Sequence, residues 1–382
     1  MEDISKLRDE IDDIDNKLTK LFEERMNIVK RVAEYKKNNN VPVLNSNREE
    51  EVINKNIKNL KDKTLNQYAR EYLDSMMTIS KNYQKNYLNS LSVKDNSIET
   101  DESIKNISKD SILGFPGVPG AFSEEALYSF FGDGITAYNV EEFEDIFIEI
   151  VKGTIKYGIV PIENSSTGSI ADVYDYLNKY ESYIAGEICL KINQNLIGIK
   201  GASIEDITEV YSHPQGFGQS KHFLKKHSNW KLIPMSNTSK GSEYVKEQNS
   251  KNIAAIGSLR ASQIYDLEII KSNINSNDLN TTRFAVISKE LVLNKDNDKI
   301  SIVLSTEHKA GSLCNVLKHF AENSLNLLKI ESRPIKEKPW EYYFYIDFEG
   351  NLLDEKVKDV ISSLKECCSY IKILGNYKKY SE

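Results

Sequence analysis

Residues 114–127 read GFPGVPGAFSEEAL, a short apolar run followed by glycines and then by a stretch rich in helix-forming residues. Short apolar runs that alternate with Gly, Ser and Pro turns and with helical stretches are typical of an α/β domain. This pattern continues from about residue 112 to 292. Ser123 stands where the helix begins, beside backbone N–H groups that have no helical partner and that favour a bound anion. Helix capping alone would explain the same pattern.

Two further segments share this arrangement, GIVPIENSSTGSIADVYDYL at 158–177 and VYSHPQGFGQSKHFL at 210–224. A fourth segment, LNTTRF at 279–284, follows a patch of Asn and Ser. The polar residues and the proline at these turns are Asn164, Ser165, Ser166, Thr167, Ser212 and Pro214. Loops of this kind gather at the carboxyl ends of strands in open α/β sheets. Together the segments predict an anion pocket built from loops.

The flanking parts of the chain differ from this domain. Residues 1–90 contain one proline and no glycine, which favours helices, and the polar stretch at 91–110 is typical of a linker. After the charged break NKDNDK, residues 298–382 have the order strand, helix, strand, strand, helix, strand. The expected elements are a strand at 301–306, a helix at 312–323, strands at 326–334 and 341–348, a helix at 355–367 and a strand at 370–377. This order predicts a ferredoxin-like βαββαβ fold, and the α/β part between linker and break spans 111–292.

Composition excludes several classes of function. The chain has 382 residues and a net charge of −7, which argues against a basic nucleic-acid footprint. Its apolar runs are shorter than the ~20 residues that span a membrane, and its charged beginning does not resemble a secretory signal. The histidines show no metal-ligand spacing, so we expect neither a metal nor a cofactor. Four cysteines without Cys-x-x-Cys spacing predict reduced thiols in a cytoplasmic protein: Cys189, Cys314, Cys367 and Cys368.

The first helix carries apolar residues at alternating steps of four and three, which predicts a long helix packed against a partner. This apolar seam consists of Leu7, Ile11, Ile14, Leu18, Leu21, Ile28, Val32 and Tyr35. Arg25 occupies the position that the seam skips, and a packed charge needs a partner. Lys36 lies roughly 16 Å further along nearly the same face, whereas Arg8 lies about 100° around the helix and is expected to serve a site built with another chain. The segment therefore predicts a site for a dianion; an ordinary ion pair of Arg25 with Glu23, Glu24 or Glu49 is the alternative.

The segments ISKLRDEIDDIDNKLTKLFEERMNIVKRVAEYK, VPVLNSNREEEV and SKNYQ resemble the AroQ-class chorismate mutases across residues 1–88. The resemblance implies a three-helix, domain-swapped dimer that rearranges chorismate to prephenate. It places binding or catalytic groups at Arg8, Arg25, Lys36, Arg48, Glu49 and Gln84. This unimolecular reaction needs a held dicarboxylate and donors to the ether oxygen, here Lys36 and Gln84, rather than proton transfer. Asn45 stands where the family often has Asp, which implies weaker substrate binding.

The motifs GVPGAFSEEA, VPIENSSTGS, SHPQ and NTTRF resemble prephenate dehydratase. The resemblance implies two α/β lobes with a cleft between them, as in periplasmic binding proteins, and the conversion of prephenate to phenylpyruvate with loss of carbon dioxide and hydroxide. The family's catalytic threonine falls on Thr282. Departing hydroxide needs a proton, which Thr282 or Glu163 could supply, and the sequence does not choose between them.

The remaining residues predicted for this site bind substrate. Arg283 is a candidate carboxylate anchor, and Phe284 completes the Thr-Arg-Phe triplet. The candidate polar contacts are Asn164, Ser212, Gln215 and His213. For His213, packing against Pro214 is an equally good interpretation.

KAGSLCNVL at 309–317 and KIESRP at 329–334 resemble the ACT domains of dehydratases, which bind phenylalanine between two paired domains. The resemblance implies effector contacts from Gly311, Ser312, Leu313, Glu331, Ser332, Arg333 and Pro334. Gly311 allows close approach of backbone. The alternative for the Glu-Ser-Arg-Pro quartet is an edge-strand terminator.

The combined prediction is a bifunctional enzyme of phenylalanine biosynthesis that acts on chorismate and prephenate, is inhibited by phenylalanine, and forms a homodimer or larger oligomer without nucleic acid or membrane. A second hypothesis is an amino-acid-responsive regulatory protein that uses the lobes as a ligand trap. A third keeps the dehydratase but leaves the mutase weak because of Asn45.

Overall fold

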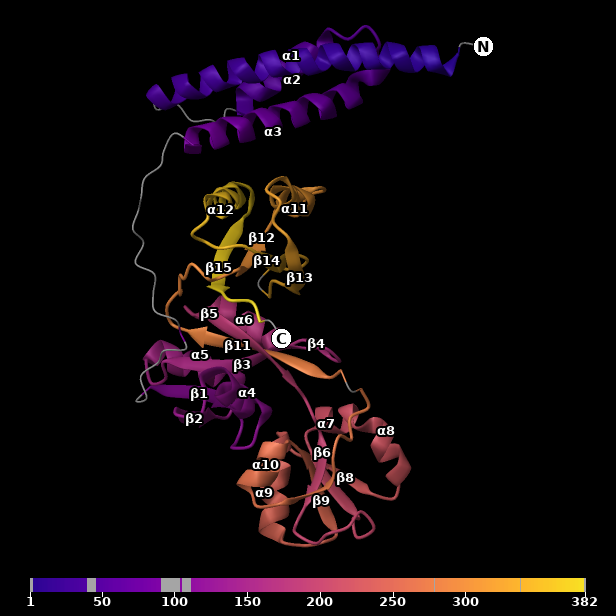
Figure 1. Ribbon diagram of the computed structural model, residues 1–382, viewed down its shortest axis with the longest axis vertical. Helices are drawn as coiled ribbons and strands as arrows, with labels where there is room; N and C mark the ends of the chain where they lie inside the picture. Colours follow the sequence, from indigo (N-terminus) through magenta and orange to yellow (C-terminus); the bar gives the residue numbers. More distant parts are fainter. Residues whose placement is uncertain are drawn as a thin grey trace. The chain divides into compact units, whose positions relative to one another are not determined.

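The computed structural model describes residues 3–39, 46–90, 104, 111–277, 279–336 and 338–380. The chain divides into two compact units, Met1–Ile98 and Glu99–Glu382 (Figure 1). The first unit is helical over its described residues, as predicted. Its elements are α1 (Ile4–Asn38), α2 (Ser46–Lys58), the short 3-10 helix η1 (Lys63–Leu65) and α3 (Asn66–Ser90).

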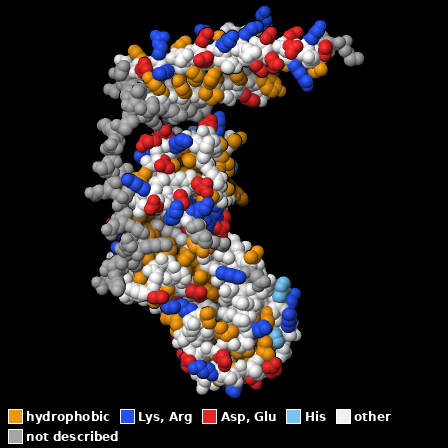
Figure 2. Space-filling view, in the orientation of Figure 1, with side chains coloured by type: hydrophobic (Ala, Val, Ile, Leu, Met, Phe, Trp, Pro, Cys, Tyr) orange, Lys and Arg blue, Asp and Glu red, His pale blue; other side chains and the backbone are white. Residues whose placement is uncertain are grey.

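Within the helical unit, α1 and α3 run parallel, since Arg25 contacts Ser80 and Glu34 contacts Tyr87. The stripe that α1 buries is Met26, Val29 and Ala33. The apolar seam predicted from the sequence is a different stripe, and its side chains remain 36–67% exposed within this single chain. Figure 2 shows apolar side chains spread along the surface of this unit. An apolar stripe of this length indicates an interaction surface.

The second unit begins with an α/β domain of two lobes (Figure 1). The first lobe contains β1 (Ile112–Pro116), α4 (Phe122–Phe131), β2 (Thr136–Val140), α5 (Phe143–Lys152), β3 (Tyr157–Asn164), β4 (Gly168–Ser169), α6 (Ala171–Lys179), β5 (Tyr183–Lys191) and β11 (Thr281–Ser288). Its strands have the order β5-β11-β3-β1-β2, in which β11 is antiparallel to both neighbours. The strand interiors are buried on both faces because helices cover the sheet.

The second lobe is built on a separate sheet in the order β10-β6-β9-β7-β8. Its elements are β6 (Asn195–Gly198), β7 (Glu209–Ser212), α7 (Pro214–Gln219), α8 (Lys221–Leu224), η2 (Lys225–His227), β8 (Lys231–Pro234), α9 (Thr238–Gln248), β9 (Ile253–Gly257), α10 (Leu259–Ile264) and β10 (Glu268–Lys271). The chain crosses between the lobes twice, from β5 to β6 and from β10 to β11. This gives the two-lobed arrangement that the sequence predicts.

The last part of the chain confirms the predicted order βαββαβ. Its elements are β12 (Lys299–Ser305), α11 (Ser312–Glu322), β13 (Leu327–Pro334), β14 (Tyr342–Glu349), α12 (Glu355–Cys367) and β15 (Tyr370–Tyr377). The strand order is β13-β14-β12-β15, and α11 and α12 cover one face of this sheet (Figure 1). Lys299, predicted to belong to a charged break, is instead the first residue of β12 and is almost completely buried.

The C-terminal domain is joined tightly to the first lobe. Its other sheet face packs on α6, where Val303 and Leu374 share one apolar core with Leu177. The two sheets also meet at Gly375, which pairs with Ile184. A Cβ at Gly375 would lie 2.3 Å from the Ile184 carbonyl oxygen, so this approach requires glycine. The lobe and the C-terminal domain therefore form one packed body.

Candidate active site

A cavity of about 650 Å³ lies between the two lobes. The first lobe contributes the loop after β1, the ends of β3 and β11 and the start of α4, while the second lobe contributes α7 and the start of α9. Residues of this wall that matter below are Phe122, Ser123, Asn164, Gln194, His213, Gln215, Lys240, Thr282 and Phe284. The volume suits a small-molecule substrate.

Asn164 and Thr282 form the polar centre of this cavity. They are register partners on β3 and β11, and both are more than nine-tenths buried. The Asn164 Nδ2 group donates to Thr282 Oγ1 at 2.9 Å. Asn164 Oδ1 accepts from the backbone N–H groups of Ser166 and Thr167, which fixes the amide orientation. The Thr282 oxygen thus accepts a hydrogen bond, and its own O–H proton remains to be donated.

Glu163 and Arg283 lie on the opposite face of the same strands, which corrects the expectation that they line a site with Thr282. Side chains alternate along a strand, so Thr282 and Phe284 share one face and Arg283 the other. A β-bulge between Arg283 and Phe284 pairs Phe284 with Pro161 instead of Ile162, so Pro161 lines the cavity beside Phe284. Glu163 is ion-paired to Arg283 and to Lys329 Nζ, the latter at 3.3 Å. We therefore withdraw Glu163 as the acid and Arg283 as an anchor inside the cavity.

Of the residues predicted at the turn before α7, His213 and Gln215 line the cavity and Ser212 does not. Ser212 is fully buried and donates to the Ile256 carbonyl, and it is not among the residues that line the cavity. His213 lines the cavity, and its Nδ1 accepts from the Gln215 N–H at 3.2 Å, which caps α7. Burial lowers the pKa of His213, which favours the neutral imidazole. Gln215 also lines the cavity and donates to Thr167 Oγ1 at 3.2 Å.

Gln194 and Lys240 are among the cavity residues that the sequence did not predict, because they belong to no motif. Gln194 lies in the crossing between β5 and β6 and is buried, and its Oε1 has no hydrogen-bond partner among the described residues. Lys240 lies in the first turn of α9, 3.8 Å from Glu141. Among the described wall residues, Lys240 is the one lysine or arginine. A Lys in the sequence TSKGSEY carries no signal that distinguishes it from a surface residue.

The three loops also differ from their predicted form. α4 starts at Phe122 with no side-chain cap, as expected for free N–H groups, and Ser123 lies in its first turn. The loop after β3 does not lead directly into a helix, because the short strand β4 intervenes and pairs back on β3. Asn164 therefore orders a turn rather than a helix start.

In the helical unit, Arg25 is half-buried and contacts the Ser80 hydroxyl and the Met77 sulfur at 3.5 Å. Burial lowers the pKa of Arg25, and no described carboxylate pairs with it. The alternative of an ion pair with Glu23 or Glu24 is not realised, since both are exposed. Among the described side chains the guanidinium is thus held by neutral groups, while Glu49, the third carboxylate of that alternative, lies outside them.

The other predicted mutase residues differ in their burial, and some lie outside the described part of the chain. Gln84 is buried one turn beyond Ser80 on α3, and no side chain or backbone group in the described part of the chain hydrogen-bonds its Oε1. Lys36 is half-buried on α1, and Arg8 is exposed. Asn45 and the side chains of Arg48 and Glu49 lie outside the described residues.

The two predicted effector segments lie on different elements, the turn before α11 and the strand β13. Gly311 precedes α11 with a φ of 83°, and Ser312 and Leu313 line a pocket of about 390 Å³ with Glu307 and Tyr342. The quartet alternates along β13. Glu331 and Arg333 face the first lobe, where Glu331 accepts from Ser169 Oγ at 3.0 Å and Arg333 pairs with Asp175 at 3.2 Å. Ser332 and Pro334 are exposed, and Pro334 ends an edge strand as the alternative interpretation holds.

The described residues contain no group of three His, Cys, Asp or Glu side chains placed to hold a metal. None of the helices described is both long enough and apolar enough to cross a bilayer.

Comparison with known proteins agrees with the two kinds of site. Residues 113–292 match the prephenate dehydratase family, and residues 7–85 match chorismate mutase type II. The chain is 33% identical to a bifunctional chorismate mutase/prephenate dehydratase of Buchnera aphidicola over 97% of this chain and 95% of the relative. Its identity to the Aquifex aeolicus protein of the same name is 30%, over 99% of both chains.

Among solved structures, a prephenate dehydratase from Arthrobacter aurescens in complex with L-Phe is 26% identical, with a TM-score of 0.65. That match covers 70% of this chain and 90% of the solved chain. The relatives match almost from end to end and share both modules. The hypothesis of a regulatory protein without catalysis is therefore not supported, and the chain belongs to the family of bifunctional chorismate mutase/prephenate dehydratases.

Proposed function

We propose that the helical unit rearranges chorismate to prephenate, that the cavity between the lobes converts prephenate to phenylpyruvate, and that phenylalanine inhibits through the C-terminal domain. The observation that carries this proposal is the Asn164–Thr282 hydrogen bond inside the interlobe cavity. We assign the mutase to 1–90, the dehydratase to 111–292 and an ACT regulatory domain to 298–382, with the linker at 91–110.

In the dehydratase step, one carboxylate leaves as carbon dioxide, and its bonding electrons pass through the ring to expel hydroxide. Thr282 donates its proton to the departing hydroxide, while Asn164 stabilises the negative charge that develops on the threonine oxygen. Threonine is a weak acid, so the hydrogen bond from Asn164 to the threonine oxygen is essential to the assignment. With Glu163 turned away and paired, Thr282 is our choice as donor.

The remaining cavity groups bind the substrate. The departing carboxylate faces apolar walls such as Phe122 and Phe284, where desolvation of the charge favours its loss. Lys240 binds the carboxylate that the product retains, with neutral His213 and Gln215 as hydrogen-bonding groups.

In the mutase step, Arg25 grips a substrate carboxylate, and Lys36 and Gln84 stabilise the ether oxygen as charge develops there. We assign supporting roles to Arg48, Glu49 and Asn45. Arg8 completes the site of a second copy, because the exposed apolar seam of α1 requires a partner helix. A homodimer is therefore the smallest assembly that we propose, in the cytoplasm.

Support for the effector role comes from the pocket beside Gly311 and from the L-Phe complex of the A. aurescens enzyme. Phenylalanine inhibits if it binds one conformation of the C-terminal domain more tightly than another. Since Ser332 and Pro334 are exposed, we propose that a second copy brings its quartet to this pocket.

The test incubates the purified full-length protein with chorismate alone and follows prephenate and phenylpyruvate, with and without phenylalanine. Phenylpyruvate that is suppressed by phenylalanine is the expected result. Chorismate decay at the uncatalysed rate, with added prephenate still converted, would refute the mutase assignment only. Unreacted prephenate in folded protein would refute the dehydratase assignment.

A further inference from the structure

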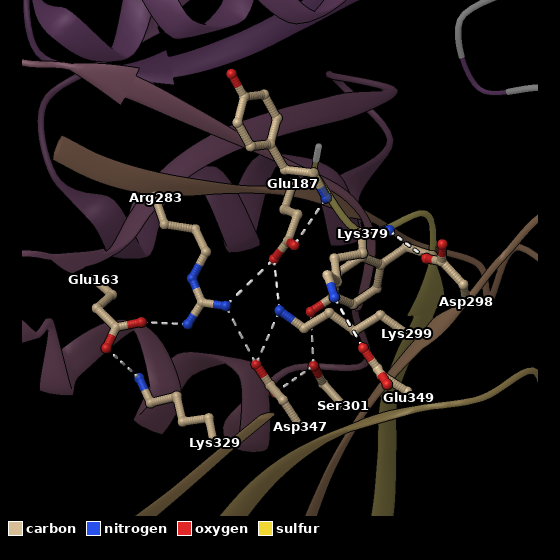
Figure 3. Close-up of polar contacts among 12 residues, drawn as sticks. Glu163, Glu187, Arg283, Asp298, Lys299, Ser301, Lys329, Asp347, Glu349 and Lys379 are labelled. Atoms are coloured by element: carbon tan, nitrogen blue, oxygen red, sulfur yellow. Dashed lines mark hydrogen bonds and ion pairs between the residues drawn. The ribbon is translucent and has the colours of Figure 1, made fainter. Parts of the chain in front are cut away.

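On the face of β3 and β11 opposite the cavity, acidic and basic side chains of the first lobe and the C-terminal domain contact one another (Figure 3). This back-face cluster consists of Glu163, Glu187, Arg283, Lys299, Lys329 and Asp347. The proposed chemistry of the cavity uses none of them.

Arg283 is the centre of the cluster. It is ion-paired to Glu163 and lies 3.5 Å from both Glu187 and Asp347. Lys299 Nζ contacts the same two carboxylates, Glu187 at 2.8 Å and Asp347 at 3.2 Å. Lys299 is 2% exposed, so these charges are shielded from water and their interactions are strong.

The cluster lies where the C-terminal domain meets the catalytic strands of the first lobe. Glu163 and Arg283 are the register partners next to Asn164 and Thr282 on β3 and β11. The C-terminal domain supplies Lys299 from β12, Lys329 from β13 and Asp347 from β14. The C-terminal domain is therefore ion-paired to the two residues next to the catalytic pair.

Lys329 also contacts the segment that follows β3. Lys329 Nζ lies 3.3 Å from Glu163 and donates to Ser169 Oγ at 2.8 Å and to the Tyr174 hydroxyl at 2.7 Å. Ser169 is on β4, which pairs with Glu163 and Asn164. Lys329 thus holds both sides of the turn that Asn164 orders.

We propose that the C-terminal domain is part of the dehydratase's positioning machinery: Lys329 and Asp347 hold the Asn164–Thr282 pair in its reactive geometry through Glu163 and Arg283. This inference rests on the proposed dehydratase function. A purely stabilising interface would affect folding stability alone, whereas this proposal also predicts a slower chemical step.

The test compares Lys329→Met and Asp347→Asn with the control Lys372→Met in the full-length protein. Lys372 also crosses from the C-terminal domain to the first lobe, donating to the Leu177 and Tyr180 carbonyls at 2.8 Å, but none of its hydrogen bonds to described residues reaches β3 or β11. We expect kcat for prephenate to fall about tenfold or more in the two cluster variants, with KM within about twofold. The control should lose thermal stability but keep its kcat, and mutase activity should persist in all three.

A double-mutant cycle separates positioning from stability. In an Asn164→Asp background the reactive pair is already broken, so Lys329→Met should have almost no further effect on kcat. An equal loss in both backgrounds would overturn the inference, as would Lys329→Met with the kcat of Lys372→Met. If Asp347→Asn does not fold, Lys329→Met alone decides. Failure of the wild type to convert prephenate would instead refute the proposed function.

Discussion

The amide of Asn164 donates to the hydroxyl oxygen of Thr282 at 2.9 Å, although the two residues are 118 positions apart in the chain. Strand pairing of β3 with β11 makes them register partners. The direction of the bond matters because it leaves the threonine proton to be given away. Each partner can be changed with little change in volume, and the second active site in the same chain serves as an internal control.

Thr282→Val removes the hydroxyl but keeps the shape of the side chain. We expect dehydratase kcat to fall by about 10²–10⁴, the usual contribution of a positioned proton donor. Thr282→Ser keeps the hydroxyl and should retain activity within about tenfold of the wild type. Initial rates with prephenate measure both, and mutase rates should not change. A valine variant with more than a tenth of the wild-type kcat would rule out Thr282 as the donor.

Asn164→Asp keeps the acceptor that holds the backbone N–H groups of Ser166 and Thr167. The carboxylate cannot donate to Thr282, so the threonine turns its own proton toward residue 164. We expect kcat to fall about 10²-fold, as for loss of one oxyanion donor, with thermal stability close to the wild type. Combined kinetics and thermal unfolding distinguish this outcome from a collapsed loop, which would lower both.

Gly375→Ala tests the junction between the first lobe and the C-terminal domain. The added methyl group would lie 2.3 Å from the Ile184 carbonyl oxygen, so the sheets must separate. We expect a loss of about 1–3 kcal/mol in the free energy of unfolding. Gly134→Ala is the control, because a Cβ there meets nothing within 4 Å. Equal denaturant midpoints for the two variants would show that the junction is not tight.

The sequence predicted elements well where local pattern and tertiary packing agree. The βαββαβ order appeared because each strand is a short β-branched or aromatic run and each helix has one apolar face. It predicted residues of the cavity less well. Arg283 was predicted in the cavity as part of the Thr-Arg-Phe triplet, whereas alternation along a strand places adjacent residues on opposite faces.

Other features depend on contacts between distant segments and leave no local signal. The bulge between Arg283 and Phe284 is one of these, because it exists only in the pairing with β3. Lys299 is a second: it stands in a run of charges typical of a solvated loop, yet three strands bury it beside Glu187 and Asp347. The apolar seam of α1 was recognised, but the sequence could not show that a single chain leaves it exposed.

Arg25→Met tests the mutase site. The guanidinium has neutral partners within the described chain, so a long apolar side chain replaces it without leaving a buried carboxylate unpaired. We expect mutase kcat/KM to fall about 10²–10³-fold, with stability unchanged or increased and dehydratase rates intact. Arg31→Met, an exposed change on the same helix, is the control. Retained mutase activity accompanied by a lower melting temperature would favour a structural role for Arg25.

His213 predicts how the dehydratase responds to acid. Burial lowers its pKa from the ordinary 6.5, so the folded protein takes up this proton only at lower pH than the unfolded chain does. The stabilising contribution is therefore complete above pH 6.5 and is lost as pH falls through the folded pKa. Protonation of Nδ1 also breaks its bond to the Gln215 N–H and moves a wall of the cavity.

We expect kcat/KM for prephenate to decline on an acid limb centred below pH 6.5. His213→Asn retains a side-chain cap for α7 and should flatten that limb. If the acid limb persists unchanged in His213→Asn, a group other than His213 causes it.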